Sequence, residues 1–221
     1  MASAGLQETI SYPATTLETL DKVQSVEEAN PPLRIANPLS SEREYMRTSL
    51  RASILMTLSS NRRVSQNESI RIFEVGRVYL PKEEARERDL PDEREVLVGV
   101  LSGPRFQTSW VAVEDDMGFF DAKGALEYVF DRLGVEVDYQ PSEDPTLQTG
   151  RAARLLSAGE LLGIAGEVRP NVLEAFDLEG YPVAMFEIDI EALLNVVARV
   201  DHAYKGASRY PESYRDLALV V

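Results

Sequence analysis

Three aspartates in one short stretch have the side chains best suited to chemistry. Asp115, Asp116 and Asp121 could offer carboxylate oxygens to a hard cation such as Mg²⁺. The same stretch is the expected start of a helix, where the positive end of the helix dipole favours acidic side chains. We therefore interpret these aspartates as helix-start residues and predict no metal site.

The other groups that could take part in chemistry are isolated in the sequence. His202 is the single histidine and has no suitably spaced serine or carboxylate, so we interpret it as a surface or helix-end residue. Trp110 could stack on a ligand, but we favour packing under a loop. The absence of cysteine excludes a thiolate nucleophile and cysteine-ligated metals, and no GxxxxGKS/T phosphate motif occurs. The residues alone predict no catalytic, cofactor-binding or metal site.

The net charge of the chain limits the kinds of molecule that its surface can bind. The 221 residues carry 23 lysines and arginines against 37 aspartates and glutamates, which gives a formal net charge of −14. Such a surface repels phosphate backbones and disfavours direct nucleic-acid binding. Residues 41–71 are a local exception, rich in arginine. This basic segment could meet an acidic partner, or it could simply decorate a solvated helix.

Hydrophobic periodicity predicts the elements that position these groups. Strand patterns occupy residues 9–12, 69–80, 96–101, 135–140, 152–156, 161–168, 183–190 and 217–221. Helical patterns occupy residues 16–23, 49–62 and 117–133, with shorter ones after Pro170 and Glu191. Threonine or serine is expected to cap the helix at 49–62, and Gly134 to stop the helix at 117–133. Strands in adjacent pairs, such as the hairpin turning at Ser157-Ala158-Gly159-Glu160, predict an α+β fold with an antiparallel sheet.

The ends and the hydropathy of the chain suggest its setting. No apolar run approaches the ~20 residues of a membrane span, and no signal peptide opens the chain, so we expect a cytoplasmic protein without a membrane partner. The last residues, 217–221, are apolar and prone to form a strand, and strand-like residues follow the first methionine closely. Both ends lead us to expect a fragment of a longer protein.

Seven sequence blocks, in order, resemble the β subunits of bacterial phenylalanine–tRNA ligases (phenylalanyl-tRNA synthetases), specifically their catalytic-like core domain. The blocks are Gly5-Leu6-Gln7-Glu8 with Ser11-Tyr12, Asn37-Pro38-Leu39-Ser40 with Met46-Arg47-Thr48-Ser49-Leu50, Ile72-Phe73-Glu74-Val75-Gly76-Arg77-Val78-Tyr79, Phe119-Phe120-Asp121-Ala122-Lys123-Gly124, Gly163 with Gly166-Glu167 and Pro170, Phe186-Glu187-Ile188-Asp189, and Tyr214-Arg215-Asp216-Leu217-Ala218-Leu219-Val220-Val221. The resemblance covers essentially the whole chain. It implies a core similar to that of class II aminoacyl-tRNA synthetases, over residues 1–210. Residues 211–221 would begin the connection to an anticodon-binding domain.

The resemblance also implies that this core is inactive. Active class II domains hold ATP with two arginines, and guanidinium groups stabilise the charge that builds on phosphorus. Where the first arginine is expected, this chain has Leu80-Pro81, and residues 186–192 offer three acids and no arginine. We therefore expect no catalytic residue and no cofactor in this chain, with ATP and Mg²⁺ bound elsewhere in the whole enzyme.

A retained fold without its chemistry indicates a scaffold. By resemblance the partner is the catalytic α subunit, in an (αβ)₂ heterotetramer that attaches phenylalanine to tRNA, with tRNA contacted by other domains of the β subunit. The implied interface lies at about residues 37–61. Its candidate residues are Asn37, Pro38, Arg43, Met46, Arg47, Leu50, Ile54 and Leu58. Two alternatives stay open: an active ATP-dependent ligase domain, and a free-standing ligand-binding or adaptor module that reuses the fold.

Overall fold

The structure is a computed structural model of the chain. It describes residues 1–23, 31–65, 68–82, 90–106, 115–200, 213–216 and 218. Its strands are β1 (Gln7–Glu8), β2 (Ala14–Thr15), β3 (Tyr45–Met46), β4 (Ile70–Leu80), β5 (Asp92–Ser102), β6 (Asp138–Pro141), β7 (Leu147–Ser157), β8 (Glu160–Val168) and β9 (Val183–Asp189). Its helices are α1 (Leu17–Asp21), α2 (Arg51–Val64), α3 (Phe119–Leu133), α4 (Pro170–Ala175) and α5 (Ile190–Val197), with short 3₁₀ turns η1 (Ala2–Ala4) and η2 (Ser41–Arg43). The predicted α+β class is confirmed.

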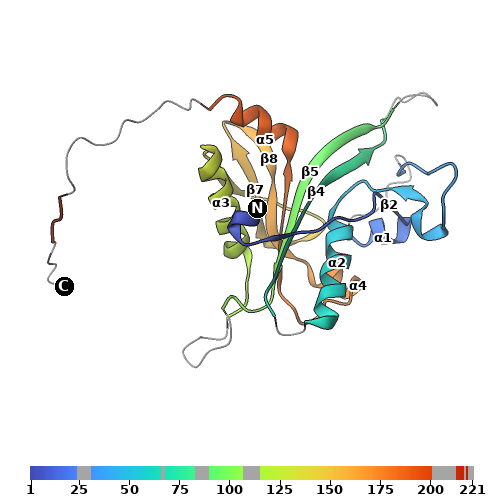
Figure 1. Cartoon of the computed structure of the whole chain (residues 1–221), viewed down its shortest axis with the longest axis horizontal. Coiled ribbons are helices and arrows are strands. Elements are labelled where there is room, and N and C mark those ends of the chain that lie inside the picture. The colour runs from blue at the N-terminus through green and yellow to red at the C-terminus, as the bar shows by residue number, and fades with distance from the viewer. Residues whose placement is uncertain are drawn as a thin grey trace.

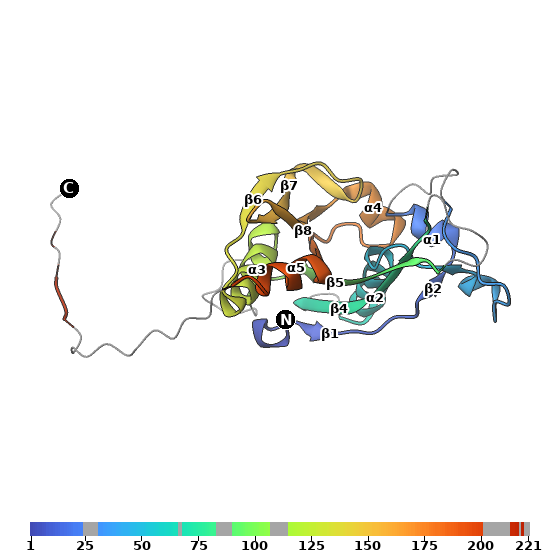
Figure 2. The same ribbon diagram turned by 90° about the horizontal axis from the view of Figure 1, so that it is seen from above.

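One large sheet organises the described part of the chain. Its seven strands run in the order β1-β4-β5-β9-β8-β7-β6, and every pair is antiparallel except β1 with β4. Figure 2 shows β1 and β4 at one edge and β6 and β7 at the opposite edge. A separate pair, β2 and β3, is also antiparallel. The prediction of an antiparallel sheet is therefore correct for this sheet apart from the short β1.

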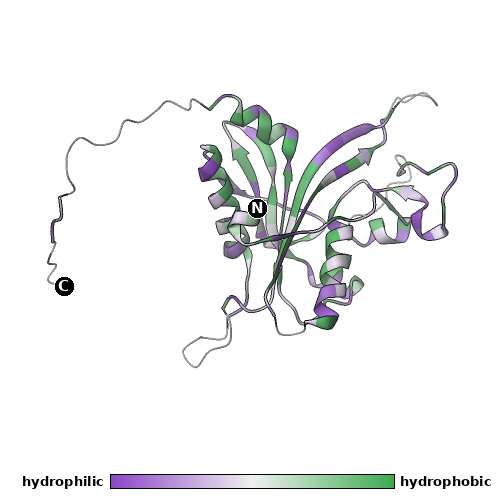
Figure 3. Ribbon diagram, in the orientation of Figure 1, coloured by the Kyte–Doolittle hydropathy of each residue, from purple (hydrophilic) through white to green (hydrophobic). Residues whose placement is uncertain are grey.

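Side-chain alternation divides the core into two layers on opposite faces of the sheet. On β5, Val96, Val98 and Val100 belong to one buried cluster, whereas Leu97 and Leu101 belong to the other. Helix α2 packs on the first face, and α3 and α5 pack on the second (Figure 1). Figure 3 shows hydrophobic residues concentrated in the strands between these helices. The sheet thus serves both layers.

A two-stranded ribbon extends past the middle of the sheet. β4 pairs with β5 from Leu80 opposite Asp92 to Ile70 opposite Ser102, but β9 joins β5 only from Val96 onward. On the other side of β9, pairing with β8 begins at Gly163. A Cβ at Gly163 would overlap the carbonyl oxygen of Glu187, so glycine permits this close approach of β8 and β9. The ribbon and the β7–β8 hairpin diverge beyond the end of β9 (Figure 1).

Local signals set most helix ends as predicted. The Thr16 side chain accepts a hydrogen bond from Thr19 N at 3.1 Å before α1, and Pro170 is the first residue of α4. Gly134 ends α3 in the left-handed conformation, with φ of 70°. The β7–β8 turn also has positive φ at Ala158 and Gly159, which agrees with a tight hairpin.

Two of the expected strands need correction. Residues 9–12 form no strand, and Thr9 N instead donates to Phe73 O beside β4. The strand expected to begin at residue 135 begins at Asp138. Leu50, fully buried, occupies the cap position of α2, and the expected serine cap acts from one residue earlier, since Ser49 Oγ accepts a hydrogen bond from Arg51 N at 3.1 Å. The strand expected at 217–221 lies almost entirely outside the described residues.

Within the residues that the structure describes, no helix is long and apolar enough to cross a membrane.

Candidate functional site

A central cleft lies on the α2 face of the sheet, between the β4–β5 ribbon and the β7–β8 hairpin. It has a volume of about 630 Å³. Val78, Leu80 and Val96 line it from the ribbon, and Leu161 and Ile164 line it from β8. Each of these two opposite walls also carries an arginine, Arg94 on β5 and Arg154 on β7, and the remaining charges lie between the walls.

Arg51, the first residue of α2, is the central charged group of the cleft. Its Nη1 donates to both carboxylate oxygens of Asp144 at 2.9 Å and to Thr146 Oγ1 at 3.1 Å. Its Nη2 donates to Glu187 Oε1 at 2.9 Å. Burial alone would lower the pKa of the Arg51 guanidinium, but the charges of Glu187 and Asp144 outweigh it and raise this pKa above its usual value. Arg51 therefore stays charged, and that charge is neutralised within the chain.

The charges that line the cleft balance. Among the described residues, three arginines line the cleft: Arg51, Arg94 and Arg154. Three acidic residues line it as well: Asp144, Glu187 and Asp189. Arg94 pairs with Asp92 at 2.8 Å, and Arg154 donates to Gln140 Oε1 at 2.8 Å. Asp189 accepts a hydrogen bond from Ala192 N at 3.0 Å at the start of α5. Hence the cleft presents no excess positive charge to a phosphate group.

Residues from both segments that the sequence analysis compared with class II domains line this cleft. Leu80 lines it at the end of β4, and Glu187 and Asp189 line it from β9. Arginine is absent from these two segments, as the sequence shows, but Arg51, Arg94 and Arg154 reach the cleft from α2, β5 and β7. Sequence reasoning missed Arg51 because its acidic partners lie 93 and 136 residues away along the chain.

A second hollow, here called the α2 groove, lies on the outer side of α2. It has a volume of about 630 Å³ and lies between α2 and the segment around β2 and η2. Met56, with 50% of its surface exposed, and the small residues Ser53, Thr57 and Ser60 line it from α2. Arg43 stacks over the Tyr12 ring at 3.7 Å on the opposite wall. The groove thus combines an exposed thioether, several hydroxyl groups and a stacked cation–aromatic pair.

The predicted interface residues divide into two groups. Asn37 and Pro38 are exposed, and Arg43 and Met46 are half-buried. The remaining four are buried within this chain: Arg47 is 5% exposed, and Leu50, Ile54 and Leu58 are 0% exposed. Leu50, Ile54 and Leu58 pack on the chain's own sheet, and Arg47 pairs with the buried Glu74, so these four side chains present no surface to a partner. A charged substitution of Arg47 or Ile54 would therefore unfold the domain rather than test an interface.

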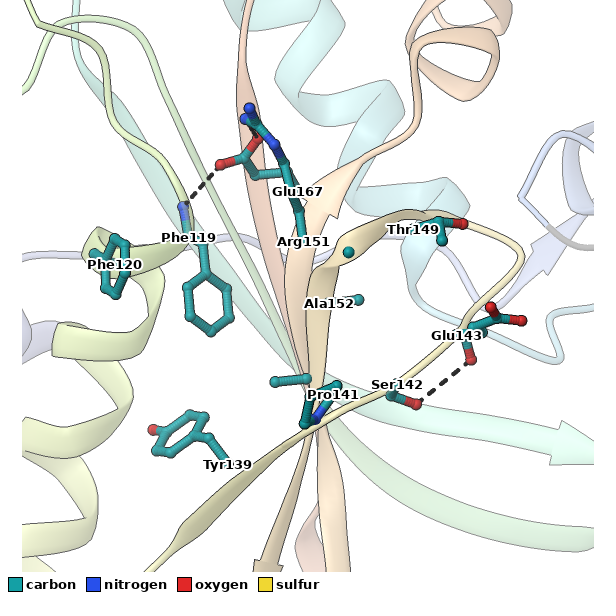
Figure 4. Close-up of a pocket in the computed structure, with 12 residues that line it drawn as sticks. Phe119, Phe120, Tyr139, Pro141, Ser142, Glu143, Thr149, Arg151, Ala152 and Glu167 are labelled. Carbon is teal, nitrogen blue, oxygen red and sulfur yellow. Dashed lines mark hydrogen bonds and ion pairs between the residues drawn. The ribbon is translucent and has the colours of Figure 1, made fainter.

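A third hollow, which the sequence did not suggest, lies beside the start of α3. It has a volume of about 800 Å³, with Phe119 and Tyr139 on one side and Glu143 and Thr149 on the other (Figure 4). Arg151 pairs with Glu167 at 2.5 Å at its rim. Burial raises the pKa of the Tyr139 hydroxyl, and Glu127 adds to this effect. The aromatic rings come from distant segments, which is why no local pattern revealed the pocket.

Of the three aspartates interpreted as helix-start residues, Asp121 lies in the first turn of α3, whereas Asp115 and Asp116 precede the helix. Asp121 accepts hydrogen bonds from Gly118 N at 2.9 Å and from Arg105 Nε at 2.9 Å. Asp115 also pairs with Arg105. No group of three or more potential metal ligands is found among the described residues. His202 and Trp110 lie outside the described residues.

Comparisons with known proteins point to one family. A family model described as the phenylalanyl tRNA synthetase beta chain CLM domain matches residues 1–190. The phenylalanine–tRNA ligase beta subunit of Dehalococcoides mccartyi strain CBDB1 is 39% identical over 221 residues, which cover 100% of this chain and 26% of that protein. The beta subunits of Halalkalibacterium halodurans and Bacillus cereus strain ATCC 14579 are 35% and 31% identical over 223 residues, and each match covers 100% of this chain and 27% of the relative. The chain spans about a quarter of the length of these curated relatives.

Proposed function

Because the chain belongs to the family of the phenylalanyl-tRNA synthetase beta chain CLM domain, we propose that it is a non-catalytic scaffold of a phenylalanine–tRNA ligase. Its partner would be the catalytic α subunit, in an (αβ)₂ assembly in the cytoplasm. That assembly would use ATP and Mg²⁺ to attach phenylalanine to tRNA, with tRNA contacted by other domains of the β subunit.

The sheet topology supports a core similar to that of class II synthetases, as proposed for residues 1–210. Antiparallel strands β4, β5, β9, β8, β7 and β6 with helices on both faces fit such a core. The connection proposed for residues 211–221 lies mostly outside the described residues.

The central cleft carries the proposal that the domain is inactive. Stabilising a transferring phosphoryl group requires guanidinium groups that are free to contact its oxygens. Arg51 is the most deeply placed arginine of the cleft, and two carboxylates of the chain already engage it. An active ligase, the main alternative, would need this arginine to be available. A titration of the isolated chain with ATP should therefore show no binding.

The α2 groove is the surface that we propose for the α subunit, in place of the buried stripe of α2. It includes Arg43 from the predicted interface, and its lining residues on α2, Ser53 to Ser60, fall within the predicted range 37–61. Its exposed Met56 offers apolar area, and the stacked Arg43 and Tyr12 offer a cation and an aromatic face. Residues of these types are enriched at the centres of protein interfaces.

The test is complex formation with a catalytic α subunit, measured by size-exclusion chromatography. Met56→Glu places a charge in the groove without touching the core, so we expect it to lower the affinity at least tenfold. Leu194→Glu is the matched control, since Leu194 is 59% exposed on α5, which packs on the opposite face of the sheet. Loss of the complex with both variants, or with neither, would contradict the proposed interface.

A further inference from the structure

We infer that the central cleft is a latent binding site for phosphate-class anions, and that Asp144 and Glu187 block it by pairing with Arg51. The inference concerns the chain's own cleft and does not depend on the α subunit. It begins from an unusual placement: an arginine side chain only 12% exposed lines a cleft of about 630 Å³. Buried cations are held by a compensating anion, and here the chain itself supplies that anion.

The guanidinium of Arg51 is nearly saturated by its two acids. Arg51 Nη1 donates to both carboxylate oxygens of Asp144, and Nη2 donates to Glu187. Both terminal nitrogens of the guanidinium are therefore engaged. Ser49 Oγ also contacts Glu187 Oε2, at 3.5 Å. The two carboxylates thus occupy the positions where phosphate oxygens would bind a forked guanidinium.

Other donors in the cleft could serve the same anion. The hydroxyl residues Thr48 and Ser49 line the cleft next to Arg51, and Arg94 and Arg154 line it as well. If Asp144 and Glu187 became neutral amides, Asp189 would be the one acidic residue left among the described lining residues, against three arginines. Arg51 would then be a largely buried charge without a counter-charge, a condition that anion binding relieves.

The isosteric amides should preserve the fold while removing the charge. Asp144 Oδ1 accepts hydrogen bonds from Thr146 N at 2.8 Å and Leu147 N at 3.2 Å, and the amide oxygen of asparagine can accept both. Glutamine at position 187 can still accept from Arg51 Nη2. The Asp144→Asn and Glu187→Gln pair therefore changes the electrostatics of the cleft more than its shape.

The test is a calorimetric titration of the whole 221-residue chain with inorganic pyrophosphate at low ionic strength. We expect the double variant D144N/E187Q to bind pyrophosphate at least tenfold more tightly than the unmodified chain. Adding Arg51→Met should remove that gain, since it removes the guanidinium while keeping an unbranched side chain of similar reach. Circular dichroism and thermal unfolding establish that each variant is folded.

The matched control carries the same change in net charge outside the cleft. Glu93 pairs with Arg77 at 3.1 Å and Glu160 pairs with Arg199 at 3.0 Å, so E93Q/E160Q neutralises two paired acids elsewhere on the surface. An equal gain in this control, or a folded D144N/E187Q chain that binds no better than the unmodified one, would overturn the inference. So would pyrophosphate binding by the unmodified chain at the double variant's affinity. If the double variant does not fold, E187Q alone is measured, and a folded E187Q chain without any gain would count equally against it.

Discussion

A buried ion pair between Arg47 and Glu74 joins three separate segments of the chain. Arg47 Nη1 lies 2.8 Å from Glu74 Oε1, and Arg47 Nε donates to Arg77 O at 2.8 Å. Ser11 Oγ donates to both carboxylate oxygens of Glu74, at 2.9 and 2.8 Å. Glu74 is 1% exposed, so this network is shielded from solvent and fixes the segment around Ser11 against β4.

The pair predicts strong coupling between its two residues. Arg47→Met should lower the free energy of unfolding by about 3–5 kcal/mol, because it leaves the Glu74 carboxylate buried without its cation. Replacing Glu74 with methionine as well should recover part of this loss. Urea denaturation of the two single variants and the double variant measures the coupling, and simple additivity of the two losses would show that the pair is not coupled.

At the scale of elements, the start of α3 depends on one side chain. Asp121 accepts from Gly118 N and from Arg105, whose Nη2 lies 3.0 Å from Asp121 Oδ2. Partial burial alone would raise the pKa of the Asp121 carboxyl, but the hydrogen bonds from Arg105 and Gly118 outweigh it and lower this pKa. The ionised carboxylate is therefore the form that the folded state favours.

This direction sets the pH dependence of the cap. A carboxyl whose pKa is lower in the folded state stabilises the fold above its unfolded pKa of about 3.9, and loses that effect as the pH falls through its folded pKa. We expect Asp121→Asn to cost about 1 kcal/mol at pH 7 and progressively less below about pH 4. Thermal unfolding of both proteins between pH 7 and pH 2 measures this convergence. Asp131→Asn, at the exposed end of the same helix, is the control and should not lower stability at pH 7.

Elements that depend on neighbouring residues could be predicted from the sequence. Gly134 stops α3, Pro170 opens α4, and the Ala158-Gly159 turn joins β7 to β8, because each acts through its own backbone conformation. The β-rich run at residues 96–101 likewise predicted the buried part of β5. The long-range features could not be predicted this way.

The α2 stripe shows why the candidate interface was harder to predict. The spacing of Leu50, Ile54 and Leu58 correctly places them on one face of a helix. Periodicity does not say whether that face packs on the chain's own sheet or on another protein, and here it packs on the sheet. In the same way, nothing local brings Arg51 to Asp144 and Glu187, whose meeting depends on the completed sheet.

At the scale of the whole molecule, the two apolar layers share one sheet. Leu58 on α2 belongs to one layer and Phe186 on β9 to the other, and both are 0% exposed. Since β5 and β9 contribute side chains to both faces, neither layer can lose its packing without disturbing the strands of the other.

This arrangement predicts cooperative unfolding of the described core. Leu58→Ala should cost about 2–5 kcal/mol and Phe186→Ala about 3–5 kcal/mol, because each leaves a cavity in a fully buried layer. Both should shift the same single urea transition, with costs that add to within about 0.5 kcal/mol. Circular dichroism and hydrogen exchange should give coincident transitions; separate unfolding of the two layers would contradict the shared sheet.

Different residues determine the shape and the charge of the central cleft, and this has a consequence for the evolution of such proteins. Its shape is held by strands and helices from most of the chain, whereas its neutrality is held by the carboxylates around Arg51. Codons for aspartate and asparagine, and for glutamate and glutamine, differ by a single base. Point mutations in a descendant gene could therefore change the net charge of this cleft while leaving its shape unchanged.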